Sequence, residues 1–450
     1  MVISAWWAII LAIPVLVFGE LLVRRSRLLS QLFIPPAVAG GLLVALICLG
    51  ANLGGSFRIH FATDVDTRWW TWLVCAEPEW LQSPGRNVNS PFLLAFFACI
   101  GLNGSWALIK RSSVPAVLFL GLAGAFAVLQ NLVGVGLAKL LELPPLLGLV
   151  YGSVSLTGGH ITALGFAAEL EKAGVQNALG TSMATATCGI IASAVVGGIV
   201  ASMLIHRRRL RPAAGDPKPA PAHSAADGLL SDLRSLFMYG RPFLMHLLQS
   251  AQTGILADLR QLGRLGKPLF LHLALVLFCI KAGSWINWIV QTKVAFPVYI
   301  GAILFGFLIR NLLDAAGVKW IRADVLNTIT SVALGLFMTS AMMSLNLVEL
   351  SHAVTPMFLI LSVQVVLMAL FAWLVTFRFL GRDYDAAVMA SGHIGFGLGE
   401  TPNALANMKA IEEVFGPAPR AFLVLALVVN LFIKLINAVN ISLFLQFLAP

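Results

Sequence analysis

Runs of about twenty apolar residues recur along the whole chain, and they limit its fold more than any other feature. Hydrophobic residues make up 59% of the 450 residues and charged residues only 11%, far from the averages of soluble domains. A run of this length is what a helix needs to cross the hydrocarbon core of a bilayer. The sequence therefore predicts an all-α, polytopic membrane protein.

Each half of the chain contains five apolar spans and one interrupted segment, which lies before the last span of that half. In the first half the spans are residues 4–23, 32–53, 91–108, 114–141 and 181–205, and the interrupted segment is 146–170. In the second half they are residues 268–290, 296–309, 329–345, 354–377 and 421–444, and the interrupted segment is 386–407. We expect a first repeat over residues 1–205, a linker over 206–267 and a second repeat over 268–450.

The basic residues are grouped at the ends of spans, so the formal net charge of +10 reflects topology and not a surface for nucleic acid. Arg207, Arg208, Arg209 and Arg211 open the central linker, which we therefore expect on the cytoplasmic side. Counting spans from this linker puts both termini outside and most other basic clusters inside. An odd number of spans in each half then requires the two halves to be inverted relative to each other.

Short motifs repeat in the same order in both halves. Pro36-Ala37-Val38-Ala39-Gly40 resembles Pro297-Val298-Tyr299-Ile300-Gly301, and Gly159-His160 in the first interrupted segment matches Gly392-His393 in the second. Inverted repeats with two broken segments are the architecture of several secondary transporters, whose breaks hold ions and small anions near the middle of the membrane. We expect residues 146–170 to be re-entrant from outside and residues 386–407 from inside.

The second interrupted segment carries Gly392, Gly395, Gly397 and Gly399 within eight residues, followed by Glu400, Thr401, Pro402 and Asn403. Glycine and proline both weaken helices, so the sequence predicts irregular backbone here. Irregular backbone survives at membrane depth only inside protein or beside a polar cavity. The alternative is close helix packing, which explains one or two glycines better than four with a proline and a carboxylate.

The first interrupted segment gathers hydroxyl groups and glycines in an otherwise apolar stretch. They are Ser153, Ser155, Thr157, Gly158, Gly159, His160 and Thr162. Hydroxyl and free carbonyl oxygens suit an alkali cation, whereas helix N-termini opposite them would attract a carboxylate. For the serines we favour hydrogen bonding to their own helix, and for residues 157–162 a role in binding. His160 and His393 are interpreted as hydrogen-bonding anchors, with a titrating role as the alternative.

Two ionisable residues lie in or beside apolar sequence. Lys434 falls within the final span and shares helical spacing with Asn430 and Asn437, and Glu400 follows the glycine run. Charged groups at this depth are usually paired or face a cavity, so we expect Glu400 and Lys434 to interact. A static ion pair and a functional role are both consistent with the sequence.

Three further observations concern regions outside the core of the repeats. The outside loop 60–90 holds four tryptophans among acidic residues, and we expect it to lie on the membrane surface as a cover. Residues 211–226 are rich in proline and alanine and predict a flexible linker, and residues 228–266 predict amphipathic helices on the inner face. Four of the five cysteines lie in apolar runs, which excludes a disulfide framework or a cysteine metal site.

Several stretches resemble bacterial sodium/glutamate symporters. They include Phe33-Ile34-Pro35-Pro36-Ala37-Val38-Ala39-Gly40, Leu156-Thr157-Gly158-Gly159-His160 and, as the strongest match, Ser391-Gly392-His393 continuing as Gly395-Phe396-Gly397-Leu398-Gly399 and Thr401-Pro402. The resemblance covers nearly the whole chain apart from the tryptophan loop and the linker. It implies an inverted-repeat fold, a homodimer and sodium-coupled uptake of L-glutamate across the bacterial inner membrane.

The expected solute and ion site comprises Thr157, Gly158, Gly159, Thr162, Gly395, Gly397, Gly399, Glu400, Thr401, Asn403 and Lys434. A sodium ion could be held by Thr157, Thr401 and backbone carbonyls, and no other cofactor is expected. Two positions depart from the resemblance, because the position of Glu400 is typically small in these symporters and that of Lys434 often carries an acid. The ammonium group of Lys434 can take the place of a bound sodium ion. These two departures therefore leave open whether transport is coupled to sodium and which carboxylate is carried.

The leading function is secondary active transport of glutamate or a related small carboxylate by alternating access. A sodium-independent carrier of another small organic anion, coupled to protons or working by exchange, is the alternative. A channel fits less well, because two inverted breaks suit alternating access to one site. The chain has no His-Glu-x-x-His stretch and no evident Gly-x-Ser-x-Gly elbow with triad partners, so an intramembrane enzyme is disfavoured.

Overall fold

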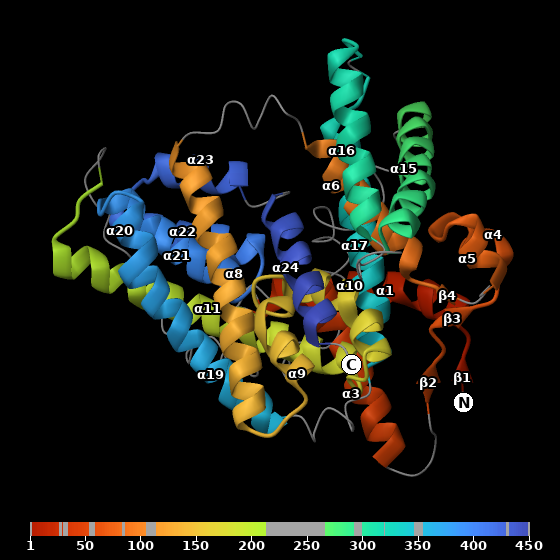
Figure 1. Ribbon diagram of the computed structural model, residues 1–450, viewed down its shortest axis with the longest axis horizontal. Coiled ribbons are helices and arrows are strands. Elements are labelled where there is room, and N and C mark those ends of the chain that lie inside the picture. The colour runs from red at the N-terminus through yellow and green to blue at the C-terminus, as the bar shows by residue number, and fades with distance from the viewer. Residues whose placement is uncertain are drawn as a thin grey trace. The chain divides into compact units, whose positions relative to one another are not determined.

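The computed structural model describes residues 2–26, 29, 35–53, 59–82, 86–104, 114–212, 266–291, 299–318, 320–345, 354–428 and 432–448, most of which are helical (Figure 1). They divide into two compact units, Met1–Trp106 with His223–Val348 and Ala107–Ala222 with Glu349–Pro450. Each unit therefore draws on both halves of the sequence. The repeats expected at residues 1–205 and 268–450 are divisions of the sequence and not these compact units, so they stay a prediction. Most of the predicted linker and amphipathic helices, at 213–265, lies outside the described residues.

Six described helices are long and apolar enough to cross a membrane. They are α1 (Ala5–Arg25), α8 (Val114–Leu140), α11 (Ala178–Arg208), α15 (Lys267–Gln291), α17 (Ala323–Met343), and α19 (Val354–Phe371), which continues through the π-helical turn η2 (Ala372–Thr376) into α20 (Phe377–Phe379). Shorter ones are α3 (Pro36–Leu53), α6 (Ser90–Asn103), α16 (Tyr299–Ala315) and α24 (Phe432–Leu448). Each predicted span overlaps one of these helices. The last predicted span also covers α23 (Pro419–Val428), and Asn430 lies outside the described part.

In the first unit, glycines let helix backbones approach each other closely. Gly101 of α6 lies against Gly306 of α16, and a side-chain carbon at Gly101 would overlap backbone atoms of that helix. Gly40 of α3 lies in the same way against α1. The rings of Phe97 and Tyr299 stack 4.0 Å apart between α6 and α16. Close packing through small residues is what holds helices together where lipid removes the hydrophobic driving force.

The tryptophan-rich loop of this unit consists of short elements held to α15. In it β2 (His60–Phe61) pairs in parallel with β1 (Val2–Ile3), and β3 (Asp64–Val65) pairs antiparallel with β4 (Arg86–Asn87). The loop also contains α4 (Arg68–Val74) and α5 (Glu77–Gln82). The Lys281 ammonium of α15 donates hydrogen bonds of 2.9 Å to the carbonyls of Trp72 and Cys75. Because such bonds involve a charge they are strong, and Lys281 anchors the loop.

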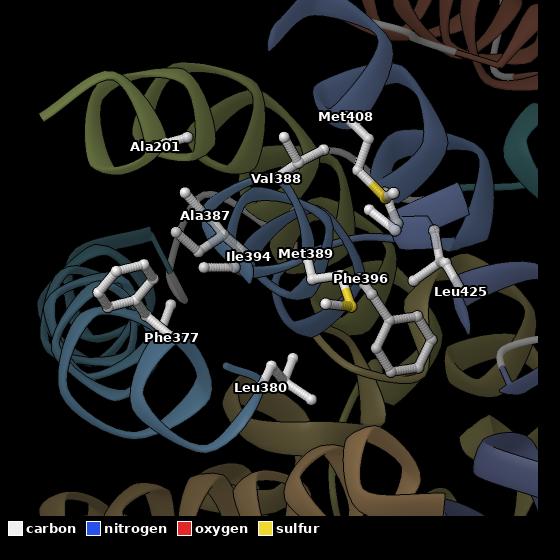
Figure 2. Packing of buried hydrophobic residues seen from close by; sticks show 14 of the residues in the cluster. Ala201, Phe377, Leu380, Ala387, Val388, Met389, Ile394, Phe396, Met408 and Leu425 are labelled. Atoms are coloured by element: carbon white, nitrogen blue, oxygen red, sulfur yellow. The ribbon is translucent and has the colours of Figure 1, made fainter. Parts of the chain in front are cut away.

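The second unit surrounds one buried helix, α21 (Tyr384–Gly397). Figure 2 shows Met389 and Phe396 of α21 among side chains of neighbouring helices, such as Ala201 of α11, Phe377 of α20 and Met408 of α22 (Thr401–Phe415). The unit also contains α8, α19, α23, α24, α9 (Pro145–Leu149), the π-helical turn η1 (Val150–Val154) and α10 (Gly159–Lys172). A helix that is buried on all sides has no polar face, which agrees with the mostly apolar sequence of α21.

The structure corrects the predicted extent of the second interrupted segment. Residues 386–407 are predicted to be irregular, but α21 is helical as far as Gly397, and the break covers only residues 398–400. Gly392 and Gly395 face α22, so the close-packing alternative holds for these two glycines. Inside an apolar environment the helical hydrogen bonds outweigh the cost of about 1 kcal/mol per glycine. Pro402 lies in the first turn of α22, where a missing N–H is tolerated.

We predict that Gly101→Ala lowers the thermal stability of the purified protein, because the added methyl group would overlap the backbone of α16. Overpacking of this kind costs about 1–3 kcal/mol. The matched control is Gly50→Ala in α3, where the added carbon would have nothing within 4 Å. Thermal unfolding followed by intrinsic fluorescence compares the two variants, and equal melting temperatures would contradict the close approach of α6 and α16.

Candidate solute site in the second unit

The first backbone break lies between α9 and α10. It begins around Gly152, whose φ of −104° and ψ of −136° are not helical. Side-chain amides bind the backbone here: the Ser153 N–H donates to Asn131 Oδ1 of α8 at 2.9 Å, and the Ser153 carbonyl accepts from Asn437 Nδ2 of α24 at 3.0 Å as well as from the Gly158 N–H at 2.8 Å. The residues on both sides of the break are helical, in α9 and α10. The irregular part is therefore shorter than the predicted segment 146–170.

The second break, residues 398–400, lies directly against the first. Gln130 of α8 joins them, because its Nε2 donates to the Gly397 carbonyl at 2.8 Å and its Oε1 accepts from the Thr157 hydroxyl at 2.5 Å. Gln364 of α19 donates in turn to the Gln130 carbonyl at 2.8 Å. Backbone that leaves the helix inside an apolar protein needs such partners. The two broken segments are therefore in contact, and their depth in a membrane stays a prediction.

The charged groups at this junction form one cluster. Glu400 Oε1 accepts a hydrogen bond of 2.8 Å from the backbone N–H of His160 and lies 3.4 Å from His160 Nδ1. The His160 side chain is fully buried and that of Glu400 is 12% exposed. Lys434 of α24 attracts Glu400 electrostatically. His160 is thus a direct partner of Glu400 that the sequence did not indicate, and the expected interaction of Glu400 with Lys434 stays a prediction.

The predicted site residues fall into two groups. Thr157, Gly159, Gly397, Glu400 and Lys434 come together at the junction of the breaks. Gly158 packs on Thr162 within the first segment, Gly395 packs on α22, and Gly399 lies beside Asn403. The side-chain atoms Thr401 Oγ1 and Asn403 Nδ2 are buried and have no hydrogen-bond partner among the described atoms. Gly158 and Gly395 mainly allow close packing, whereas polar contacts at the junction come from Thr157, Glu400 and the Gly397 carbonyl.

The two histidines that match in sequence lie in different surroundings. His393 is enclosed by the rings of Phe119, Phe126 and Phe371, and its Nδ1 forms a hydrogen bond of 2.8 Å with Thr376. These contacts agree with a structural anchor. His160 also forms a hydrogen bond, of 3.0 Å between Nε2 and Thr187 Oγ1, and it faces Glu400, so the two histidines bind different partners and their role as anchors stays a prediction.

Buried polar atoms without a hydrogen-bond partner concentrate in this unit. Within the described residues only Asn89 and Thr339 belong to the first unit, and the rest are Asn131, Tyr151, Ser153, His160, Asn177, Ser182, Gln364, Ser391, His393, Thr401, Asn403, Asn437, Asn440 and Ser442. Buried polar groups are normally paired, so this interior is suited to polar ligands. Thr401 Oγ1 and Asn437 Oδ1 are oxygens of this set, whereas Thr157 Oγ1 donates a hydrogen bond to Gln130 Oε1. The described part contains no group of three His, Cys, Asp or Glu residues that could hold a metal.

Sequence reasoning missed Gln130, Asn131 and Gln364. Each is an amide in a long apolar helix, and a polar side chain in such a run is a signal that backbone or ligand needs a partner. Glycines mark the interrupted segments in the sequence, whereas the residues that connect the segments lie in the flanking helices.

Comparison with known proteins decides the family. The model of the sodium/glutamate symporter family matches residues 83–225 and 249–417. The chain belongs to the sodium/glutamate symporter family. The sodium/glutamate symporter of Escherichia coli (strain K12) is 33% identical over 434 residues, which are 96% of this chain and 94% of that protein. The one of Haemophilus influenzae is 30% identical over 443 residues, 97% of this chain and 95% of that protein.

Membership of the sodium/glutamate symporter family, together with the six long apolar helices, makes this a multi-pass membrane protein. The relatives are named as symporters and not as enzymes. The resemblance inferred from the sequence motifs is thereby confirmed. Two of those motifs, at residues 156–160 and 391–402, are the ones that meet at the junction of the breaks.

We predict that Gly397→Val abolishes solute uptake while membrane insertion persists. The added carbons would collide with Met368 and Phe126 and displace the Gly397 carbonyl from Gln130. The matched control is Gly121→Val in α8, because the space at Gly121 is open. Uptake by cells that carry equal amounts of each variant in the membrane is the measurement. Normal uptake by the Gly397 variant would count against the junction as the solute site.

We predict that Glu400 and Lys434 are energetically coupled. Glu400→Ala should lower the melting temperature more than Lys434→Met, because it removes a carboxylate that both His160 and Lys434 attract. The double variant should lose less stability than the two single losses added together, by about 0.5–3 kcal/mol. Additive losses in thermal unfolding of the purified proteins would show that the two residues act independently.

Proposed function

We propose that this protein is a secondary active transporter that takes up L-glutamate or a related small carboxylate together with a cation. The observation that carries the proposal is the contact of the two broken segments through Gln130. Broken helices that meet in this way bind ions and small anions in other transporters. The relatives are named for sodium and glutamate, which supports these two as cation and solute.

In this proposal residues 157–162 and 395–403 form the walls of the solute site. α22 begins at Thr401, and the side chain of its N-cap residue Glu400 makes no capping hydrogen bond there, so the positive end of the helix dipole favours the carboxylate of the solute. Thr401 and Asn403 add a hydroxyl and an amide that are buried and unpaired within the described structure. Carbonyl and hydroxyl oxygens at the breaks suit the coupling cation.

Alternating access is part of the same proposal. The two breaks come from different halves of the sequence, which we propose to be inverted repeats whose broken segments enter the membrane from opposite faces. A junction between them can then be exposed to one side of the membrane at a time. The resemblance to bacterial symporters further supports a homodimer in the inner membrane, and the basic loops support termini outside.

One observation favours a second candidate, a sodium-independent carrier that is coupled to protons or exchanges organic anions. His160 and Lys434 already place positively charged or polarisable groups around Glu400. Like charges repel, so Lys434 disfavours a sodium ion at the same place. The ammonium group of Lys434 would then supply the positive charge that a bound cation supplies in a symporter.

Uptake of labelled glutamate into proteoliposomes tests both candidates. We predict accumulation against the concentration gradient, which a channel cannot produce, with the solute chemically unchanged. Dependence on a sodium gradient would support the symporter. Equal uptake without sodium would support the second candidate, and Lys434→Asp should then impose sodium dependence, because it removes the ammonium and adds oxygen donors. Failure to accumulate glutamate or any related small carboxylate would overturn both.

A further inference from the structure

The second unit contains a cavity of about 590 Å³, and no residue of the expected solute site is among the described residues that line it. The cavity lies where α8 ends and α19 begins, next to α9 and the start of α11, at the lower edge of the view in Figure 1. Pockets that bind small organic molecules have volumes of about 300–1,000 Å³. The cavity is therefore large enough for an organic ligand.

The lining of this cavity combines alkyl groups with a few polar ones. Leu143, Leu147 and Pro356 contribute alkyl groups, whereas Tyr151 and Asn177 contribute a hydroxyl and an amide. No charged residue is among the described residues of the lining. The first turn of α11 is also already served by a carboxylate of the chain, because its second N–H donates to the side chain of residue 171 at 3.4 Å. This lining favours an uncharged ligand with an apolar body.

Two hydrogen-bond donors of the lining are unsatisfied. The Tyr151 side chain is fully buried in η1, and its hydroxyl has no partner among the described atoms. Asn177 Oδ1 accepts from the Gly180 N–H at 3.2 Å and so caps α11, while its Nδ2 is buried without a partner in the described part of the chain. Buried polar groups are normally paired, and both of these groups can donate to a carbonyl oxygen. A ligand that pairs them carries a hydrogen-bond acceptor.

The surface beside the cavity is exposed and apolar. Leu140 and Leu141, just before Leu143, are exposed, and so is Val354, two residues before Pro356. α8, α11 and α19 are long enough to cross a bilayer, and each of them meets the cavity at one of its ends. The ends of spanning helices reach the interfacial layer of the bilayer, where ester carbonyls join the acyl chains to the lipid head groups. The molecule that presents an uncharged carbonyl on an alkyl chain at this level is a membrane lipid.

We propose that this cavity binds the acyl-ester region of a membrane lipid. An acyl chain packs on Leu143, Leu147 and Pro356, and the ester carbonyls accept hydrogen bonds from the Tyr151 hydroxyl and from Asn177 Nδ2. Tyr151 directly precedes the non-helical residue 152, at which the first break begins. The bound lipid therefore contacts the segment that carries this break. The inference goes beyond the proposed function, because the lipid is neither the solute nor the coupling ion.

Photo-crosslinking of the full chain in proteoliposomes tests the position of the lipid. The probe is a phosphatidylethanolamine with a diazirine in one acyl chain, and labelled peptides are identified by mass spectrometry. We expect labelling within residues 140–151 and 174–181. Leu147→Trp fills the cavity with a larger side chain and should reduce this labelling to the level found on the exposed face of α8. The matched control is Leu132→Trp, an exposed position of α8 outside the lining, which should leave the labelling unchanged.

Lipids that differ only in the carbonyl test the two donors. Diacyl phosphatidylethanolamine should raise the melting temperature of the purified protein more than the dialkyl ether lipid of the same chain length and head group, because the ether lacks the carbonyl acceptor. Tyr151→Phe keeps the ring and removes the donor, so it should weaken the binding of the ester lipid about fivefold and reduce the difference between the lipids. The matched control is Tyr384→Phe, whose hydroxyl donates to the Gly416 carbonyl away from the cavity, and it should keep the preference for the ester.

Equal stabilisation of the wild-type protein by ester and ether lipids would overturn the inference, and this comparison decides even if Leu147→Trp does not fold. Undiminished labelling of the cavity in a folded Leu147→Trp would overturn it as well. So would protection of the cavity peptides by excess detergent but not by excess phospholipid, because the occupant would then be a detergent-like amphiphile. Neither readout requires uptake of a solute, so the inference and the proposed function can fail independently of each other.

Discussion

Backbone that leaves the helix inside an apolar protein has no water to bind, and this constraint governs the second unit. Asn131 and Asn437 bind the two sides of Ser153, and Gln130 binds the Gly397 carbonyl. Leaving such groups unpaired would cost several kcal/mol each. The amides of α8 and α24 therefore stabilise the backbone at the breaks.

The sequence predicted the long helices well, because the thickness of the hydrocarbon layer dictates their length and composition. It predicted the breaks less well. The glycine run at 392–399 is irregular only at its end, since Gly392 and Gly395 lie in α21 and pack against α22. The sequence alone does not distinguish a glycine that weakens a helix from a glycine that lets two helices pack closely. The close contacts that distinguish them exist only in the folded chain.

Part of the candidate site was also within reach of the sequence. Thr157, Glu400 and Lys434 could be found because polar groups in apolar surroundings are unusual. The partnership of Glu400 with His160 could not be found, because it depends on how segments 240 positions apart pack together. The repeated Gly-His motif did not indicate that the surroundings of the two histidines differ, with aromatic rings around His393 and a carboxylate beside His160.

The mixed origin of the second unit has a consequence for its assembly during synthesis. The segment from α8 to α10 is made long before α21, α22 and α24, which belong to the same unit. During that interval the Ser153 carbonyl lacks the amide of Asn437, and the start of α10 lacks Glu400. The early segment therefore lacks both of these hydrogen bonds until the end of the chain has been made. The C-terminal helix α24 thus supplies the last partner of the first break, and a chain that ends before it would lack this hydrogen bond.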